Sequence, residues 1–276
     1  MTKPRLQLSR RTFATTAAVA AGAVALDAFA IEPRWLDVTR HDVPIPNCPG
    51  SLEGFTIVQL TDVHLSSFGS LEQSVVEAVG RVQPQLVVIT GDALDSPEIL
   101  PVLRQLCSEL RNAGGGTELL GLAGNWEHWG KVSLESLHAA YASAGGKLLV
   151  NDGITVSGVS VVGTDDGLAG LPDLPRVFSQ ARAEVALLLT HSPALLDRAA
   201  PDAPRFSLSL AGHTHGGQGT IGPFAPLVPP GSGRFVAGFY DTPVGRAYVS
   251  RGLGTSVLPA RFACRPELPV FRLVRA

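Results

Sequence analysis

Short apolar runs alternate along the chain with segments whose apolar residues recur every three or four positions. Residues 55–60 and 86–89 are nearly continuous apolar runs, a pattern typical of strands buried on both faces. Between them, the apolar residues of 70–82 recur at helical spacing, which predicts an amphipathic helix that ends before Pro84. The folded part of the chain is therefore expected to begin as strand, helix and strand.

The same alternation continues to the C-terminus. It favours an α/β class whose strands are mostly parallel and buried. The 276 residues, of which 45% are hydrophobic and 17% charged, suffice for one large domain with a substantial core. We expect further strands at 118–122, 159–162, 185–189, 206–210, 246–250 and 270–274, and further helices at 96–111, 132–143, 173–183 and 193–200.

The N-terminus has the pattern of an export signal. Arg10 and Arg11 precede an alanine-rich stretch over 14–30, and this order resembles a twin-arginine signal. We therefore expect residues 1–30 to be the signal, cleaved near Ala30, and 31–276 to be the domain. The twin-arginine machinery would be a partner and would place the domain on the periplasmic or extracellular side of the cytoplasmic membrane. Asp27 interrupts the apolar stretch, and an uncleaved signal that anchors the protein is the alternative.

Charge and cysteine content narrow the classes further. The formal net charge is -2 and no basic run lies outside the leader, so nothing favours a nucleic-acid partner. The three cysteines form no Cys-x-x-Cys pair, which argues against a disulfide framework or a structural cysteine-zinc site. A single Cys48–Cys264 bridge in an oxidising compartment is left open, and Cys107 falls in a helix-like run as a small core residue.

Polar residues that can bind metal ions follow five of the expected strands. In open α/β sheets, ligands bind outside the carboxyl ends of the strands, so these side chains are expected to meet there. A dinuclear centre needs a bridging carboxylate, which predicts Asp92 as the bridge, and Asn125 would add a neutral oxygen. The i, i+2 pairs would place both side chains on one side of an extended chain. The candidate ligands are Asp62, His64, Asp92, Asn125, His191, His213 and His215.

These five blocks, Asp62-x-His64, Gly91-Asp92, Gly124-Asn125, His191 and Gly212-His213-x-His215, resemble the signature of the calcineurin-like metallophosphoesterases. The segments 251–254 and 261–267 look like those of an exported bacterial branch. The resemblance implies a four-layer α/β/β/α sandwich and hydrolysis of a phosphoric ester by a hydroxide held between two divalent metals, with Mn, Fe or Zn suited to a nitrogen and oxygen donor set. It also implies a first metal site of Asp62, His64, Asp92 and His215, and a second of Asp92, Asn125, His191 and His213.

One position departs from the family pattern. The family usually has His directly after the Asn, where this chain has Trp126, and an indole cannot donate a transferable proton. If the segment is extended, His128 faces the same side as Trp126. We hypothesise that His128 is the catalytic replacement, against the alternative of a surface histidine beside Trp126 and Trp129. Asp95 is expected to be a helix cap or a partner of a ligand, and Arg251 either contacts phosphate or forms an ion pair.

The segment after the last histidine block is apolar and rich in proline. It runs over 219–238 and includes Ile221, Pro223, Phe224 and Leu227. An apolar loop beside a catalytic centre can form a substrate wall or a membrane contact, which favours a lipid-like phosphoester from the cell envelope. A rigid loop packed on its own domain explains the same pattern. A pyrophosphatase acting on an acylated sugar nucleotide and a non-catalytic metal-binding scaffold are the alternative functions.

Overall fold

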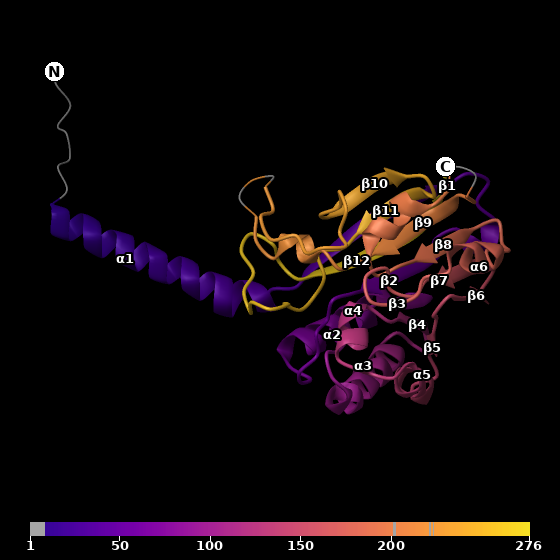
Figure 1. Cartoon of the computed structure of the whole chain (residues 1–276), viewed down its shortest axis with the longest axis horizontal. Coiled ribbons are helices and arrows are strands. Elements are labelled where there is room, and N and C mark those ends of the chain that lie inside the picture. The colour runs from indigo at the N-terminus through magenta and orange to yellow at the C-terminus, as the bar shows by residue number, and fades with distance from the viewer. Residues whose placement is uncertain (1–8, 201–202, 221, 223) are drawn as a thin grey trace, which may run out of the picture.

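The computed structural model describes residues 9–200, 203–220, 222 and 224–276, and within them two six-stranded sheets pack face to face (Figure 1). The first sheet has the order β1-β12-β2-β3-β4-β5. β12 runs antiparallel to β2, and the other neighbours pair in parallel. Its strands are β1 (Asp37–Ile45), β2 (Thr56–Leu60), β3 (Leu86–Thr90), β4 (Glu118–Leu122), β5 (Lys147–Leu148) and β12 (Glu267–Arg275).

The second sheet has the order β10-β11-β9-β8-β7-β6. Its central strands β7, β8 and β9 pair in parallel, whereas β6 and β10 join as antiparallel hairpin partners at the two edges. Its strands are β6 (Asp152–Val156), β7 (Val159–Gly163), β8 (Ala186–Leu189), β9 (Phe206–Ala211), β10 (Gly238–Thr242) and β11 (Gly245–Val249).

Helices cover the outer faces of the two sheets and complete the expected α/β/β/α sandwich. One apolar core joins the first sheet to its helices, a second fills the space between the sheets, and a third lies outside the second sheet. Short 3-10 turns occur at Gly50–Leu52, Pro97–Ile99, Pro193–Arg198 and His215–Gly217. The helices of the domain are α2 (Ser70–Val82), α3 (Leu100–Ala113), α4 (Asn125–Trp129), α5 (Leu134–Ser143) and α6 (Leu174–Ser179).

The parallel registers bring the candidate ligands to one edge. In the first sheet Leu60 pairs with Ile89, and Ile89 pairs with Gly121, so the three strands end nearly level. In the second sheet Leu189 pairs with Leu210 in the same way. Side chains that follow these strands therefore meet where the two sheets open toward each other.

Several sequence expectations are confirmed to the residue, and others need correction. The helix over 70–82 and the strand over 118–122 have the expected bounds. The expected helix over 96–111 begins as a 3-10 turn, and α3 starts only at Leu100, with Pro101 in its first turn. Residues 193–198 form a 3-10 turn instead of an α-helix. The edge strands β1, β6 and β10 were not predicted, because they alternate weakly and depend on their neighbours for pairing.

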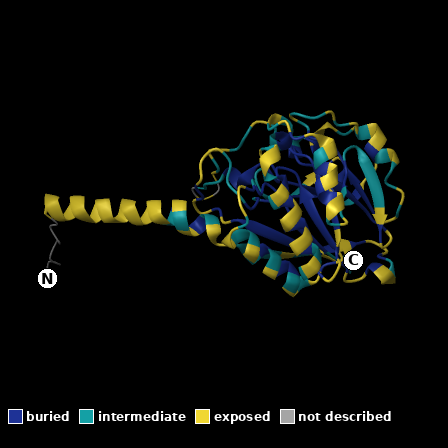
Figure 2. Cartoon of the chain, turned by 90° about the horizontal axis from the view of Figure 1, so that it is seen from below, coloured by how far each residue is buried: buried dark blue, intermediate teal, exposed yellow. Residues whose placement is uncertain are grey.

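The N-terminal segment forms a helical arm outside the sandwich. α1 (Arg10–Leu26) has no buried residue and extends away from the domain, exposed along its length (Figure 2). A π-helical turn at Asp27–Ile31 and a 3-10 turn at Glu32–Arg34 connect it to β1. The stretch from Arg10 to Arg34 is long and apolar enough to cross a membrane, by length and composition. Such a helix is consistent with either a signal or an anchor.

Candidate metal centre

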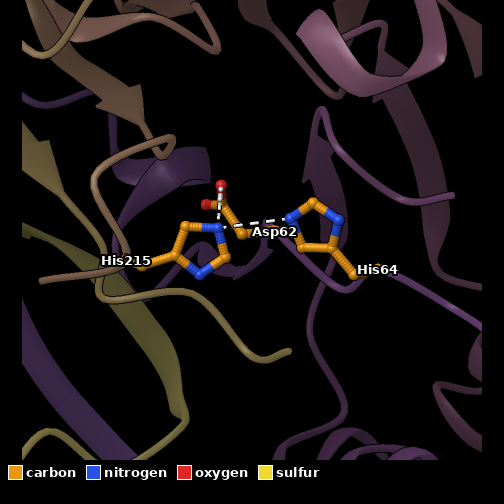
Figure 3. A group of neighbouring side chains, drawn as sticks. All are labelled: Asp62, His64 and His215. Carbon is orange, nitrogen blue, oxygen red and sulfur yellow. Dashed lines mark hydrogen bonds and ion pairs between the residues drawn. The ribbon is translucent and has the colours of Figure 1, made fainter. Parts of the chain in front are cut away.

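Three side chains from distant parts of the chain form a first cluster. Asp62 and His64 follow β2, and His215 follows β9 in a 3-10 turn (Figure 3). The two Nε2 atoms of His64 and His215 lie 3.2 Å apart, and His215 Nε2 lies 3.4 Å from the Asp62 carboxylate. All three side chains are at most 5% exposed. Their nitrogen and oxygen atoms therefore converge on one small volume.

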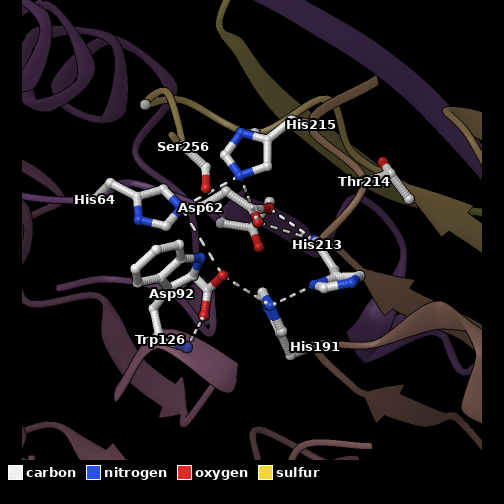
Figure 4. Close-up of polar contacts among 12 residues, drawn as sticks. Asp62, His64, Asp92, Trp126, His191, His213, Thr214, His215 and Ser256 are labelled. Carbon is white, nitrogen blue, oxygen red and sulfur yellow. Dashed lines mark hydrogen bonds and ion pairs between the residues drawn. The ribbon is translucent and has the colours of Figure 1, made fainter. Parts of the chain in front are cut away.

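A second cluster lies beside the first. Asp92, His191 and His213 come together, with Asp92 Oδ2 3.1 Å from His191 Nε2 and His213 Nδ1 3.3 Å from the same nitrogen. Asn125 Oδ1 lies 3.1 Å from His191 Nε2. Asp92 Oδ2 is also 3.8 Å from His64 Nε2. Asp92 therefore lies between the clusters, which is the position that the sequence predicted for a bridge (Figure 4).

The backbone at these residues differs from the extended geometry that the i, i+2 spacing suggested. Asp62, His64, His213 and His215 have φ values of 51°, 46°, 71° and 51°, all in the left-handed region. The premise that each pair lies on one side of an extended chain was therefore wrong. His213 and His215 contribute to different clusters, which is the division that the family resemblance implied. Non-glycine residues take these conformations at a cost, and such strain is concentrated at functional sites.

Two glycines allow the strands to approach each other this closely. A Cβ at Gly91, whose φ is +87°, would lie 2.7 Å from the ring of His191 and 2.9 Å from the Cα of Gly124. A Cβ at Gly124 would overlap the Asp92 carboxylate. Neither position has room for a side chain. The location of Asp92 between the two clusters therefore depends on glycine at both positions.

A shell of hydrogen bonds orients the rings of the candidate ligands. His64 Nδ1 lies 2.8 Å from the Asp95 carboxylate, so Asp95 contacts a candidate ligand, which is one of the two roles expected for it. His191 Nδ1 donates to the carbonyl of Thr90 at 2.9 Å, and His213 Nε2 donates to the carbonyl of Pro230 at 2.6 Å. Each of these rings is thus held by one nitrogen and points the other into the site.

Glu127 is a residue that the sequence analysis missed. Its carboxylate is buried and accepts backbone N–H groups from Asp92, Ala93 and Leu94, and also from Gly124 across the site. Burial, with the nearby charge of Asp92, raises the pKa of Glu127 to about 7. Its place two residues after the candidate ligand Asn125 was a hint in the sequence, but that place does not reveal which groups the carboxylate contacts.

The surrounding protein groups shift the pKa values of the three buried histidines in different directions. Burial lowers the pKa of His215 well below its usual value, and the charge of His64 lowers it further. Burial and the charge of His191 likewise lower the pKa of His213. Although burial opposes it, the charge of Asp92 raises the pKa of His191 well above the usual range. His213 and His215 are therefore neutral imidazoles near neutral pH, the form that binds metals.

The residues fit divalent cations. The inward nitrogens of four imidazoles face one another at 3.2 and 3.3 Å within each pair, together with two buried carboxylates. His215 Nδ1 has no hydrogen-bond partner among the described residues, so its ring is positioned by packing and by the contacts of Nε2. A donor set of imidazole, carboxylate and amide oxygen suits borderline divalent ions. Two cations on either side of Asp92 would satisfy these converging lone pairs.

Comparison with known proteins identifies the fold family. The model of the calcineurin-like phosphoesterases matches residues 55–217, more than half of the chain. The chain belongs to this family. It is 32% identical to a Bacillus subtilis (strain 168) protein named uncharacterized metallophosphoesterase YkuE, covering 97% of this chain and 98% of that protein. It is 30% identical to phosphodiesterase YaeI of Escherichia coli (strain K12), covering 97% and 100%.

The name of a further relative describes it as a transmembrane protein. A Danio rerio transmembrane protein with metallophosphoesterase domain is 28% identical over 84% of this chain and 55% of that protein. Together with the two residue clusters, the family relationship makes this chain a metallophosphoesterase with a dinuclear divalent metal centre that acts on a phosphoester. The four-layer sandwich is the architecture expected from the sequence.

The segment after Asn125 is helical in this phosphoesterase, which corrects another premise. Residues 125–129 form α4, so Trp126 and His128 do not share a face as they would in an extended strand. The Trp126 ring packs edge-on against His64, with centroids 5.7 Å apart. His128 Nε2 lies 2.8 Å from the Asp165 carboxylate, which raises the pKa of His128. The catalytic role of His128 therefore stays a hypothesis without the geometric argument that first supported it.

An apolar pocket of about 640 Å³ opens above the candidate metal ligands. The floor includes Asp92, Asn125, His213 and His215. Within the described part of the 219–238 loop, Pro226–Pro230 face the pocket, whereas Ile221 and Pro223 lie outside the described residues. The remaining wall is formed by Trp126, Trp129, Leu168, Gln218, Ser256, Val257 and Leu258.

Arg251 lies outside this pocket lining. Its guanidinium is 2.8 Å from Asp37 and 3.2 Å from Glu267, so the ion-pair interpretation holds for this residue.

All three cysteines lie in the described part of the chain and are buried free thiols. The thiol of Cys264 lies 3.3 Å from the carbonyl of His215 and contacts the backbone of the last histidine block.

Proposed function

We propose that two ligand sets share Asp92 and hold the two cations of the centre. The position of Asp92, 3.8 Å from His64 and 3.1 Å from His191, carries this assignment. When bound, the cations would polarise the phosphoryl oxygen and activate a water molecule. The first set is Asp62, His64, Asp92 and His215, and the second is Asp92, Asn125, His191 and His213.

The ions are Mn, Fe or Zn in this proposal. The donors are imidazole nitrogens and carboxylate or amide oxygens, with no thiolate among them, and this set favours borderline ions. Asn125 is a neutral donor, so the second cation would keep more of its positive charge for the phosphoryl oxygen. Asp92, shared between both, would bring the cations close enough to act on one phosphate.

We keep His128 as the proposed proton donor to the leaving group. Asp165 holds its Nε2 atom and favours the protonated ring, and the side chain is 22% exposed, so it can exchange protons with solvent. The alternative is that His128 and Asp165 only stabilise the loop after β7. A His128→Ala variant distinguishes the two: a lost rate on esters of poorly acidic alcohols supports the donor, and an unchanged rate rejects it.

The substrate that the pocket favours is a bulky, apolar phosphoester. Its walls are formed by tryptophan, leucine, valine and proline side chains, while the polar groups are concentrated at the metal residues. We propose an envelope phospholipid or a similar lipid-like ester. A pyrophosphate ester of an acylated sugar nucleotide presents the same combination of apolar chain and phosphate, and a substrate panel separates the two.

We propose that the domain acts on the exported side of the cytoplasmic membrane. The arginine pair at residues 10 and 11 and the apolar α1 support export through the twin-arginine machinery. Residues 1–30 would serve as the signal and 31–276 as the enzyme domain, or the helix would be retained as an anchor. Protease accessibility of the domain in spheroplasts tests the side of the membrane.

The central test is metal-dependent hydrolysis of two soluble probes, an aryl phosphomonoester and a bis-aryl phosphodiester. We expect turnover that requires Mn, Fe or Zn and falls by at least about 100-fold in Asp92→Asn, because one acceptor shared by both cations becomes a neutral amide. Asp42→Asn serves as the matched control, because Asp42 is exposed and pairs through Arg272 with the start of β2, at the end of the sheet opposite the site. Bound metal without Asp92-dependent turnover would refute the proposal.

A further inference from the structure

The base of α1 is part of the catalytic domain. The backbone N–H of Arg261 donates to the carbonyl of Ala28 at 2.9 Å. The buried carboxylate of Glu32 accepts the N–H groups of Ala263 and Cys264. The guanidinium of Arg265 stacks on the exposed ring of Trp35, with its Cζ atom 3.6 Å from the ring centroid. The helix is therefore joined to the domain by fixed contacts.

No flexible linker separates the apolar helix from this docking point. α1 ends at Leu26, the chain stays helical through Arg34, and β1 begins at Asp37. A helix rises about 1.5 Å per residue, so the exposed end of α1 lies within roughly 10 Å of the docked Glu32. Any bilayer that α1 enters must therefore lie directly against this face of the domain.

The same face contains the mouth of the apolar pocket. Phe262, next to the docked Arg261, forms a β-bridge with Gly219, where the 219–238 loop starts. Gln218 donates to the carbonyl of Leu258 at 3.0 Å. This hydrogen bond connects the start of the 219–238 loop to the second loop of the pocket wall, which contains Ser256, Val257 and Leu258. Figure 1 shows both loops gathered at the end of the domain from which α1 leaves.

This end of the domain has many exposed apolar side chains. Phe224 and Leu227 are 64% and 62% exposed, and Val257 is 94% exposed. Side chains this large and apolar are seldom grouped on a soluble surface without a partner. Trp35 adds an aromatic ring with a polar edge near the base of α1, the type of residue that is enriched at membrane interfaces.

We infer that α1 is retained as an anchor, that this face docks on a lipid bilayer and that the pocket opens onto the bilayer interface. The exposed side chains of Leu227, Val257 and Leu258, which line the pocket, enter the headgroup region beside the α1 span, together with Phe224 of the same loop as Leu227. Arg10 and Arg11 at the start of α1 stay on the cytoplasmic side by the positive-inside rule, which places the domain outside. Resting on the proposed function, the inference narrows the substrate class to phosphoesters whose apolar part lies in the same leaflet.

The test uses the full chain in vesicles of phosphatidylethanolamine and phosphatidylglycerol. Phe224→Cys and Leu227→Cys carry a nitroxide label, and the native cysteines are buried and stay unlabelled. The matched control is Leu134→Cys, an exposed leucine at the start of α5, which lies away from α1 (Figure 1). Collisions of each label with lipid-soluble oxygen and with a water-soluble nickel complex report its depth.

We expect the labels at 224 and 227 to gain oxygen collisions and lose nickel collisions relative to the label at 134. Equal nickel accessibility at all three positions would overturn the inference. Far-ultraviolet circular dichroism checks that each variant is folded, and two positions guard against a local effect of one label. The soluble bis-aryl phosphodiester is measured separately: if it is not hydrolysed with any metal, the proposed function fails while the docking result stands by itself.

Discussion

The carboxylate of Glu127 accepts the backbone N–H of Asp92 at 3.0 Å, although the two residues are 35 positions apart in the chain. The same carboxylate accepts the N–H of Gly124 at 2.8 Å. Glu127 thus connects the loop after β3 to the loop after β4. The place of Asp92 between the two clusters depends on this connection as well as on the parallel register of the strands.

Replacing Glu127 with Gln is expected to destabilise the fold. The amide nitrogen would face backbone N–H groups that now donate to a carboxylate, and each buried donor left without an acceptor costs about 1–3 kcal/mol. Chemical denaturation measures the free energy of unfolding. Glu118→Gln, an exposed glutamate on β4, should change it by less than about 0.5 kcal/mol. Equal stability of both variants would contradict the role of Glu127.

Removing the partner of His64 is expected to weaken metal binding. In Asp95→Ala the Nδ1 atom of His64 loses its acceptor at 2.8 Å, so the ring is free to turn away from the site. Outer-shell losses of this kind reduce metal affinity about 10–100-fold. Titration of the apoprotein with Zn or Mn measures the change. Glu98→Gln, an exposed acid three residues on, should bind metal as the wild type does.

Adding a methyl group at Gly124 is expected to reduce catalysis. The Cβ of Gly124→Ala would lie 2.3 Å from the Asp92 carboxylate and 2.5 Å from the Asp92 backbone nitrogen, so the loop must shift and carry the carboxylate with it. A shift of about 1 Å in a catalytic group can lower the rate about 100-fold. Steady-state hydrolysis of the bis-aryl phosphodiester measures kcat. Gly50→Ala meets no atom within 4 Å and serves as the control, which should keep full activity.

The ion pair of His128 and Asp165 gives a pH-dependent term to stability. The Asp165 hydrogen bond raises the pKa of His128 above 6.5, so this stabilisation is complete below 6.5 and is lost as the pH rises through the raised value. Although burial opposes it, the His128 hydrogen bond lowers the pKa of Asp165 below 3.8, so its part is lost only at lower pH. The stability advantage over His128→Asn should therefore be largest between pH 3.8 and 6.5.

Thermal unfolding across this pH range checks the prediction. The difference in melting temperature between wild type and His128→Asn is expected to shrink as the pH rises above 6.5. A His138→Asn variant, at an exposed position of α5, should show no such trend. A difference that is constant with pH would show that the ring of His128 acts by packing alone.

The sequence alone determined the fold class and the set of polar residues that meet at the strand ends. Buried parallel strands need long apolar runs and helices need apolar residues at helical spacing, so both leave a local pattern that residues 70–82 and 118–122 follow to the last position. The blocks at Asp62, Asp92 and His191 were visible for the same reason, because each directly follows such a run.

The tertiary structure decided what depends on contacts between distant segments. The family resemblance implied that His213 and His215 belong to different sites, but the left-handed backbone that separates them appears only in the structure. The helical turn α4 separates His128 from Trp126, which the spacing of residues did not reveal. Glu127 became visible as an organiser only when the loops after β3 and β4 met. Hydrogen bonds between segments far apart in the chain leave no periodic trace in the sequence, because each partner is chosen by the packing of the others.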